Sequence, residues 1–315
     1  MNMANKVSVV MSVYNEPQHF VKKAVDSILS QTFEDFEFII VCDNPKNTSL
    51  YQYLMSVKDS DKRVKIIKNE VNIGLTKSLN KAIANSEGIY IARMDADDIS
   101  EKNRFVEQVK FMDAHPNVGV CGSQINYIDE NDKIIGQNLL PVEKKNFPYM
   151  VMPFFSHPAV MMRKSSLQKL DGPYNEHFKY AQDFSLWNRL DDVCDFYNLP
   201  QILFNYRKTA NQIGAKKSSE QQDFSEEIQL SYLRKKNPSF EVNWKRLDYH
   251  KVKEIRTVIN TFGISESAIS LGTKSLCRRI NSNKILSLML ILFDLHKLGF
   301  SLRDFLAIVK HVYLN

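Results

Sequence analysis

Short apolar runs recur through the first third of the chain, and each is followed by residues with apolar positions at helical spacing. Four runs predict buried strands, at residues 7–13, 36–42, 64–67 and 89–93. After the first run, the apolar residues between Phe20 and Leu29 form one stripe of an amphipathic helix. The same periodicity predicts helices over 48–58 and 76–85, and a further helix that begins after Ser100 as its N-cap.

Strands that alternate with helices in this way build βαβ units. The sequence therefore predicts an α/β fold with a mostly parallel central sheet flanked by helices. Residues 118–128 and 133–135 are expected to add antiparallel strands to this sheet. Beyond about residue 210 the strand signal is lost and the chain reads as helical. We therefore expect two regions, a catalytic domain over 1–210 and a mainly helical C-terminal region over 211–315.

Charge distinguishes the two regions more than composition does. Of the 315 residues, 43% are hydrophobic and 25% are charged, which is usual for a globular protein and argues against disorder or a collagen-like structure. The net charge is +6, but residues 207–315 alone carry 19 Lys and Arg against 10 Asp and Glu. This basic region indicates an anionic partner, with a solvated helical face as the alternative.

Several features bear on the location of the protein. No run of about 18 apolar residues exists, and the start of the chain lacks the pattern of a signal peptide. The four cysteines form no CxxC pair, which argues against a zinc site and fits a reducing cytosol. The apolar segments 285–293 and 298–313 are either core helices or helices at an anionic membrane surface. We expect a cytoplasmic protein, and we favour peripheral binding to the inner membrane.

Polar residues follow each of the four predicted strands. The carboxyl ends of parallel strands meet at one edge of the sheet, where ligands bind. Each polar residue alone is an ordinary turn or cap residue, so the coincidence of all four groups predicts a site. The four groups are Tyr14–Pro17, Asp43–Pro45, Asn69–Gly74 and Met94–Asp98.

The group after the fourth strand has the most specific chemistry. If the strand continues, Asp95 and Asp97 point to the same side, with Asp98 beside them. Three carboxylates so close together repel one another unless a cation neutralises them. Mg²⁺ or Mn²⁺ takes oxygen ligands and commonly bridges to phosphates, so this D-x-D segment predicts a metal site. The alternative is that Asp97 and Asp98 only cap the next helix.

These segments resemble the family 2 glycosyltransferases, which are inverting enzymes with the GT-A fold. The resemblance extends over about residues 5–212 and rests on motifs that occur in the same order. The motifs are residues 7–16, residues 27–44, Asn72-Ile73-Gly74 with Asn80, residues 90–98, and the stretch from Tyr180 to Trp187. It implies transfer of a sugar from a nucleotide-sugar donor to a saccharide or lipid-linked acceptor, in capsule, lipopolysaccharide or exopolysaccharide assembly.

The resemblance also implies a role for individual residues. Asp43 would bind the base, which favours a UDP- or dTDP-sugar, and Asp183 would be the catalytic base. Asp97 would bind Mn²⁺ or Mg²⁺ directly, and Asp95 would contact the ribose and the metal-bound diphosphate. The other donor-binding residues would be Val13, Tyr14, Asn15, Glu16, Asn72, Gly74 and Lys77, and the acceptor site would include Tyr180, Trp187 and His157.

The sequence departs from the family pattern at three places. Cys42 precedes Asp43 where the family has two acids, and Gln182 precedes Asp183 where it has Glu. The family often has a metal-binding His after the position of Arg207, and no His stands there, so Arg207 or Lys208 would neutralise phosphate instead.

Two other classes of protein remain open. A metal-dependent phosphohydrolase would use Asp95 as nucleophile, but it would favour Thr or Val at the position of Ile99 and would leave Asp43 and Asp183 unexplained. A non-catalytic, membrane-associated binding protein would explain the basic region but not the carboxylates. No nucleic-acid-binding motif is present, so no nucleic-acid partner is expected.

Overall fold

The computed structural model describes residues 5–143 and 154–209, together with several helical residues between 220 and 232. The chain divides into two compact units, and the first consists of residues 1–143 and 154–225. The fold and the site described below belong to this first unit. The predicted boundary at residue 210 and the apolar segments 285–293 and 298–313 lie outside the described residues. Within the described residues, no helix is long and apolar enough to cross a membrane.

The N-terminal half of the unit is the predicted parallel sheet. Its strands are β1 (Val7–Val13), β2 (Phe36–Cys42), β3 (Val64–Lys68) and β4 (Tyr90–Arg93), in the order β3-β2-β1-β4. Every residue of β1 and β2 is buried, as expected for strands covered on both faces. The connecting helices are α1 (Gln18–Leu29), α2 (Thr48–Ser60) and α3 (Leu75–Ala84).

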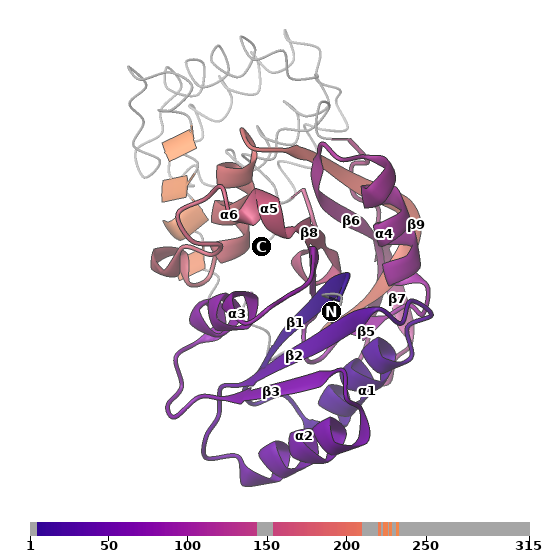
Figure 1. The fold of residues 1–315 in the computed structure, drawn as a ribbon, viewed down its shortest axis with the longest axis vertical. Coiled ribbons are helices and arrows are strands. Elements are labelled where there is room, and N and C mark those ends of the chain that lie inside the picture. Colours follow the sequence, from indigo (N-terminus) through magenta and orange to yellow (C-terminus); the bar gives the residue numbers. More distant parts are fainter. Residues whose placement is uncertain are drawn as a thin grey trace, which may run out of the picture. The chain divides into compact units, whose positions relative to one another are not determined.

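The strand order reverses between β1 and β4. Strands β2 and β3 are added on one side of β1, whereas β4 pairs with its other side. Accordingly, α1 and α2 lie on one face of the sheet and α3 lies on the other (Figure 1). Helices on opposite faces diverge at such a switch point, which leaves the carboxyl ends of β1 and β4 as the expected ligand site.

A second group of strands extends the sheet beyond β4. In the described residues these are β5 (Ile99–Ser100), β6 (Val118–Ile128), β7 (Ile134–Asn138), β8 (Met161–Arg163) and β9 (Asp195–Arg207). The predicted strands at 118–128 and 133–135 are confirmed, and they pair antiparallel. Three strands were not predicted: β5, β8 and the 13-residue β9, which runs parallel to β6. The remaining helical elements are α4 (Arg104–Ala114), η2 (His157–Ala159), α5 (Lys164–Leu167), η3 (Glu176–Phe178) and α6 (Gln182–Leu190).

One local prediction after β4 is wrong. Ser100 does not cap a helix, because it belongs to β5 and Asn103 precedes α4 instead. Ser100 donates its backbone N–H to the Ser27 hydroxyl, 3.1 Å away, and so joins β5 to α1. The strand β4 ends at Arg93, as predicted, and Asp95–Asp98 form a turn, so the condition of a continuing strand is not met.

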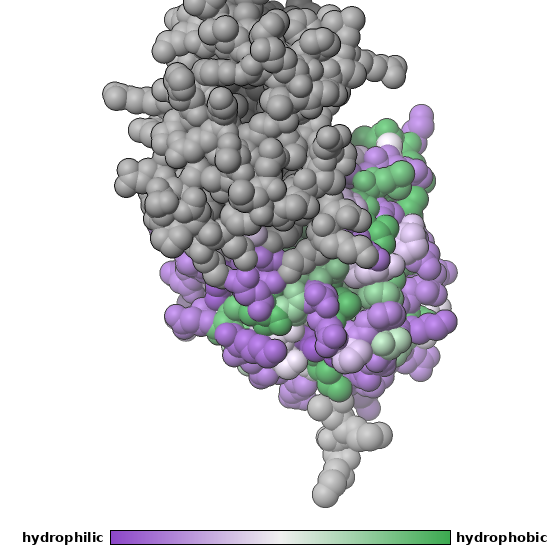
Figure 2. Space-filling view, turned by 90° about the horizontal axis from the view of Figure 1, so that it is seen from above, coloured by the Kyte–Doolittle hydropathy of each residue, from purple (hydrophilic) through white to green (hydrophobic). Residues whose placement is uncertain are grey.

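The surface in Figure 2 shows hydrophilic side chains over much of the described part, with smaller hydrophobic areas between them. A few large apolar side chains are exposed, including Val71 at 63% and Leu139 at 73%. Scattered exposed apolar residues are normal for a globular protein.

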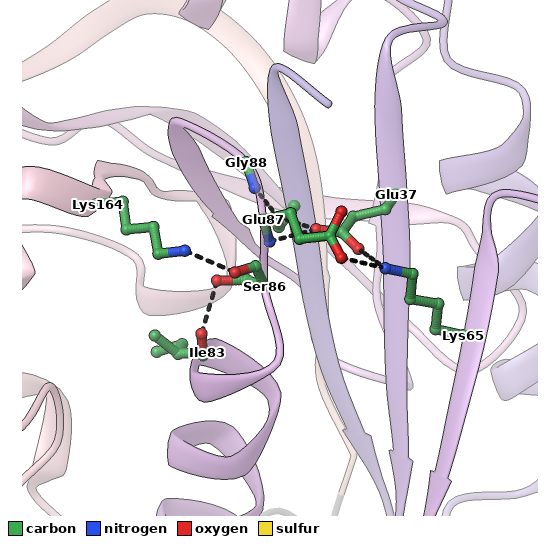
Figure 3. A network of polar contacts seen from close by, with 8 residues as sticks. Glu37, Lys65, Ile83, Ser86, Glu87, Gly88 and Lys164 are labelled. Atoms are coloured by element: carbon green, nitrogen blue, oxygen red, sulfur yellow. Dashed lines mark hydrogen bonds and ion pairs between the residues drawn. The ribbon is translucent and has the colours of Figure 1, made fainter. Parts of the chain in front are cut away.

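At the end of the sheet opposite the expected ligand site, a buried carboxylate connects the amino ends of the parallel strands (Figure 3). Glu37 of β2 is 1% exposed, and its carboxylate accepts hydrogen bonds from the Ser8 hydroxyl and the Glu87 backbone N–H, both at 2.6 Å. Its other oxygen lies 2.8 Å from Lys65 Nζ on β3. The Ser8 hydroxyl in turn accepts from the backbone N–H of Gly88 at 2.8 Å.

We expect Glu37→Gln to lower the free energy of unfolding by about 1–3 kcal/mol, because hydrogen bonds to a charged group are lost. Burial raises the pKa of Glu37, but hydrogen bonds from Lys65, Ser8 and Glu87 outweigh it, so the pKa lies below the ordinary 4.5. A lowered pKa stabilises the fold above pH 4.5, and this contribution is lost as the pH falls through the folded-state value. The difference between the two proteins should therefore shrink in acid.

Urea unfolding at several pH values measures this difference, with Glu130→Gln on the exposed β6–β7 turn as the control. Equal stabilities of the wild type and Glu37→Gln at neutral pH would show that the network contributes nothing.

Candidate functional site

The first part of the site consists of the residues that follow the carboxyl end of β1. The backbone N–H of Tyr14 donates to Glu16 Oε2 at 2.7 Å, which turns the Glu16 carboxylate back toward the strand end. Asn15 Oδ1 accepts from Asn44 Nδ2 at 2.6 Å and so joins the ends of β1 and β2. Burial raises the pKa of Glu16, and the charge of Asp95 raises it further. Glu16 and Asp95 are therefore neighbours at the switch point.

At the end of β2, Asp43 is buried and organises the loop before α3. Its Oδ1 accepts from Asn69 Nδ2 at 2.8 Å and from the Ile73 backbone N–H at 2.9 Å. Its Oδ2 accepts from the Gly74 backbone N–H at 2.8 Å. Gly74 has φ +85°, which favours glycine, and directly precedes α3. Asp43 thus fixes the loop that carries the predicted donor residues.

The other two predicted residues of this loop and helix lie at the surface. Asn72 is exposed. Lys77 is 54% exposed and its ammonium lies 3.7 Å from Glu176 Oε2. An exposed pair of this kind contributes little to stability, so Lys77 can exchange Glu176 for another anion at low cost.

The three carboxylates of the D-x-D turn, those of Asp95, Asp97 and Asp98, differ in their exposure. Asp95 is partly exposed and pairs with the guanidinium of Arg93, whose side chain is 1% exposed. Burial, together with the charges of Asp95 and Glu16, raises the pKa of Asp97 to about 7. Asp98 is buried, and its Oδ1 accepts the backbone N–H of Arg207 at 2.7 Å. The alternative to a metal site, in which Asp97 and Asp98 only cap the next helix, does not hold, because Asn103 precedes α4.

Asp183 lies in the first turn of α6, after the N-cap residue Ala181. Its Oδ1 accepts the backbone N–H of Phe184 at 2.8 Å. Burial raises the pKa of Asp183, whereas Arg93 lowers it and Asp95 raises it. The side chain of Asp183 is therefore within electrostatic range of the D-x-D turn, although the two are separated by almost 90 residues of sequence.

His157 belongs to a buried network next to Asp183. Its Nε2 lies 2.8 Å from the Tyr174 hydroxyl, and burial lowers the pKa of the imidazole, which favours the neutral form. Tyr174 is held by Asn80 of α3, which accepts the Tyr174 N–H at 2.9 Å and donates to its carbonyl at 2.8 Å. The network thus connects α3, on the donor side, with the segment that precedes α6.

The two predicted aromatic acceptor residues differ in exposure. Trp187 has no exposed surface, and its ring packs 5.0 Å from that of Phe155 and 6.1 Å from that of His157. In this position it supports the site from behind rather than forming its wall. Tyr180 is partly exposed, its carbonyl accepts from Gln221 Nε2 at 3.0 Å, and its ring lies 6.3 Å from that of Phe224.

Arg207 and Lys208, the predicted phosphate ligands, differ in exposure. Arg207 has no exposed surface, and its Nε donates to the Asp97 carbonyl at 2.6 Å. The Lys208 ammonium lies 4.3 Å from the centre of the Tyr127 ring and 4.8 Å from that of Tyr206. Arg207 is therefore shielded from solvent, whereas the Lys208 ammonium lies over two rings at an exposed position.

Two residues of the site were not predicted: Arg93 and Tyr174. For Arg93 a signal was available, because a charged residue inside an otherwise apolar buried strand needs a partner. For Tyr174 no local pattern distinguishes it from other loop residues. Its role depends on contacts with α3 that only the folded chain creates. Asn69 belongs to a predicted group, but its hydrogen bond to Asp43 is visible only in the folded chain.

Comparison with known proteins agrees with this geometry. The sequence profile described as glycosyl transferase family 2 matches residues 8–171. An uncharacterised glycosyltransferase of Methanocaldococcus jannaschii is 37% identical over 207 residues, which is 64% of this chain and 70% of the relative. The O-antigen biosynthesis glycosyltransferase WbnJ of Escherichia coli is 32% identical over 213 residues, which is 66% of this chain and 81% of the relative.

Solved structures share the fold at low sequence identity. A fragment of Staphylococcus aureus TarS, residues 1–349 in complex with UDP, has a TM-score of 0.59 and 17% identity, over 98% of this chain and 88% of the fragment. The mannosyltransferase PcManGT from Pyrobaculum calidifontis, in complex with GDP-Man and Mn²⁺, has a TM-score of 0.55 and 13% identity, over 99% and 88% of the two chains. These similarities confirm the predicted α/β fold of the GT-A type.

Proposed function

We propose that this chain, which belongs to glycosyl transferase family 2 and is a transferase enzyme, moves a sugar with inversion from a nucleotide-sugar donor to a saccharide or lipid-linked acceptor. The proposal rests on the carboxylates of Glu16, Asp95, Asp97 and Asp183, which interact electrostatically at the switch point of the sheet. Relatives that act in O-antigen and amylovoran biosynthesis support a role in the assembly of a surface polysaccharide.

In this reaction Asp183 is the general base. It takes the proton of the acceptor hydroxyl while the hydroxyl oxygen attacks the anomeric carbon, and the bond to the nucleoside diphosphate breaks on the opposite face. No covalent intermediate is needed, so a single positioned carboxylate suffices. The Phe184 N–H, which donates to Oδ1, orients this carboxylate and leaves Oδ2 for the acceptor.

The residues of the D-x-D turn fit a divalent cation. Neighbouring carboxylates and burial raise the pKa of Asp97, and a bound cation would relieve this repulsion. The described part of the chain has no group of three His, Cys, Asp or Glu that could hold a metal, so the diphosphate and water would complete the coordination. Asp97 and Asp95 would hold Mn²⁺ or Mg²⁺, which supplies a Lewis acid at the leaving diphosphate.

The two rival classes explain less of the site. A phosphohydrolase would not explain why Asp183 lies near the D-x-D turn or why Asp43 holds the loop before α3. A binding protein without activity would not require a half-buried carboxylate on α6 that interacts with Asp95. Membership of a transferase family disfavours both.

Asp43 gives the proposal a donor preference. An ionised carboxylate has about four lone-pair positions. Hydrogen bonds from Asn69, Ile73 and Gly74 occupy three of them in this structure. We propose that the remaining position on Oδ2 accepts the imide N–H of uracil or thymine, so that purine donors bind less well.

UDP and dTDP should therefore bind more tightly than GDP, by about 10-fold or more, the value of one hydrogen bond to a charged group. Calorimetry with the three nucleoside diphosphates in the presence of Mn²⁺ measures the order. Tighter binding of GDP would contradict the role of Asp43 at the base.

The basic C-terminal region extends the proposal to location. We propose that it binds the anionic inner face of the membrane and brings the enzyme to a lipid-linked acceptor. The argument rests on the excess of Lys and Arg after residue 206, in a part of the chain that is largely outside the described residues.

A further inference from the structure

Arg207 contacts the D-x-D turn through the carbonyl of Asp97 and the carboxylate of Asp98. It is the last residue of β9, and its backbone N–H donates to Asp98 Oδ1 at 2.7 Å. Its Nε donates to the carbonyl of Asp97 at 2.6 Å. These two bonds hold the turn at consecutive residues, one of them the proposed metal ligand.

The other side of the guanidinium contacts the turn between β6 and β7. Nη1 donates to the Asp129 carbonyl at 2.7 Å and lies 2.7 Å from Asp132 Oδ1. Asp132 also pairs with Lys23 of α1, and the guanidinium lies 4.2 Å from the centre of the Phe20 ring on the same helix. The Arg207 side chain therefore joins α1, the β6–β7 turn and the D-x-D turn.

We propose that Arg207 is a positioning residue for Asp97, held in place by Asp132, and that it does not contact the phosphates of the donor. This inference rests on the proposed function, because it treats Asp97 as a metal ligand. The planar guanidinium donates in several fixed directions at once, which suits it to hold two turns in one arrangement. A Lys at this position would keep the charge and lose that geometry.

The strength of the effect follows from the position of Asp97. Displacement of a reacting or ligating group by about 1 Å can cost about 10²-fold in rate even when the changed residue does not touch the substrate. Arg207→Lys should therefore weaken Mn²⁺-dependent donor binding and transfer by about 10–10²-fold. Higher Mn²⁺ should restore much of the loss, because a displaced ligand lowers metal affinity while leaving the phosphate contacts in place.

Arg63→Lys is the matched control. Arg63 also pairs with an aspartate, Asp61, donates to a backbone carbonyl, that of Leu29, and lies 4.4 Å from the centre of a phenylalanine ring, that of Phe36. It precedes β3 at the opposite end of the sheet from the site. Its side chain is 28% exposed, so Arg63→Lys should fold, and it should leave the Mn²⁺ dependence of UDP binding unchanged.

Asp132→Asn is a second variant for the case in which Arg207→Lys does not fold. The side chain of Asp132 is 33% exposed, and its φ of 66° is a conformation that Asn tolerates well, so the variant should fold. It removes the charge that holds Arg207. It should raise the Mn²⁺ concentration needed for half-maximal UDP binding, in the same direction as Arg207→Lys.

The test is calorimetric titration of UDP at a series of Mn²⁺ concentrations, with Asp97→Asn as the reference for complete loss. A rightward shift of the Mn²⁺ curve in the Arg207 or Asp132 variants supports the proposal. A loss that Mn²⁺ does not restore would instead indicate a phosphate contact and overturn it, as would unchanged curves in folded variants. If Asp97→Asn itself binds like the wild type, the metal role of the proposed function fails, and that outcome is separate from the others.

Discussion

Replacement of Asp183 by Asn is expected to slow sugar transfer by about 10²–10⁴-fold and to leave donor affinity nearly unchanged. In the proposed function the donor binds at the ends of β1, β2 and β4, whereas Asp183 belongs to α6. Asn has the size of Asp and can still accept the N–H of Phe184. It cannot take a proton, so only the chemical step should suffer.

The alternative role for Asp183 is to stabilise the start of α6. Asn also stabilises helix starts well, so under this alternative the variant would be almost silent. Turnover and donor affinity should be measured on the same protein, with thermal unfolding as the control for folding. Asp195→Asn at the exposed start of β9 is a suitable control substitution. A folded Asp183→Asn variant with more than about a tenth of wild-type turnover would favour the helix-start role.

The pH dependence of wild-type turnover is a second test of the role of Asp183. Burial raises the pKa of Asp183 above its ordinary value, and a general base acts only when it is ionised. Turnover should therefore rise with pH through this raised pKa and then level off. The rise should be absent from the residual activity of Asp183→Asn.

Replacement of Asp97 by Asn should remove the Mn²⁺ dependence of donor binding. Loss of an outer partner of a metal ligand typically costs 10–100-fold in metal affinity, so loss of a direct ligand should cost at least about that much. The Asn amide retains an oxygen but not the charge that the cation requires. Removal of one carboxylate also reduces the repulsion around Asp95 and Glu16, so the fold should not be weakened.

Calorimetry of UDP binding, with Mn²⁺ and with chelator, measures this effect. The wild type should bind more tightly with Mn²⁺, and Asp97→Asn should bind equally weakly in both conditions. Asp195→Asn again serves as the control. An Asp97→Asn variant that keeps the wild-type response to Mn²⁺ would show that the D-x-D segment does not bind the metal.

The parallel half of the fold could be predicted because its signals are local. The strands β1 and β2 are mostly apolar and buried at every position, and the helix between them has one clear apolar stripe. The strand β9 was missed because it alternates apolar and polar residues irregularly and includes Pro200, which is atypical of a strand. The short strands β5 and β8 form because they pair with β9 and β4, and their own sequences are too short to predict a strand.

The site was predictable where it follows from strand ends and not where it follows from packing. The positions of Glu16, Asp43 and Asp97 follow from the rule that ligands bind at the carboxyl ends of parallel strands. The burial of Trp187 and of Arg207 could not be predicted, since an Arg or Trp near a site looks the same in sequence whether it faces the ligand or supports the loop.

Thermal unfolding of the wild type in the presence of nucleotide sugars tests the central claim most directly, because it needs no knowledge of the acceptor. A ligand at 100 times its dissociation constant stabilises the native state by about 2.7 kcal/mol, which corresponds to a rise of several degrees in Tm. We predict that a UDP- or dTDP-sugar raises the Tm with Mn²⁺ and far less with chelator. A panel in which no nucleotide sugar raises the Tm, or in which the chelator makes no difference, would contradict a metal-dependent glycosyltransferase.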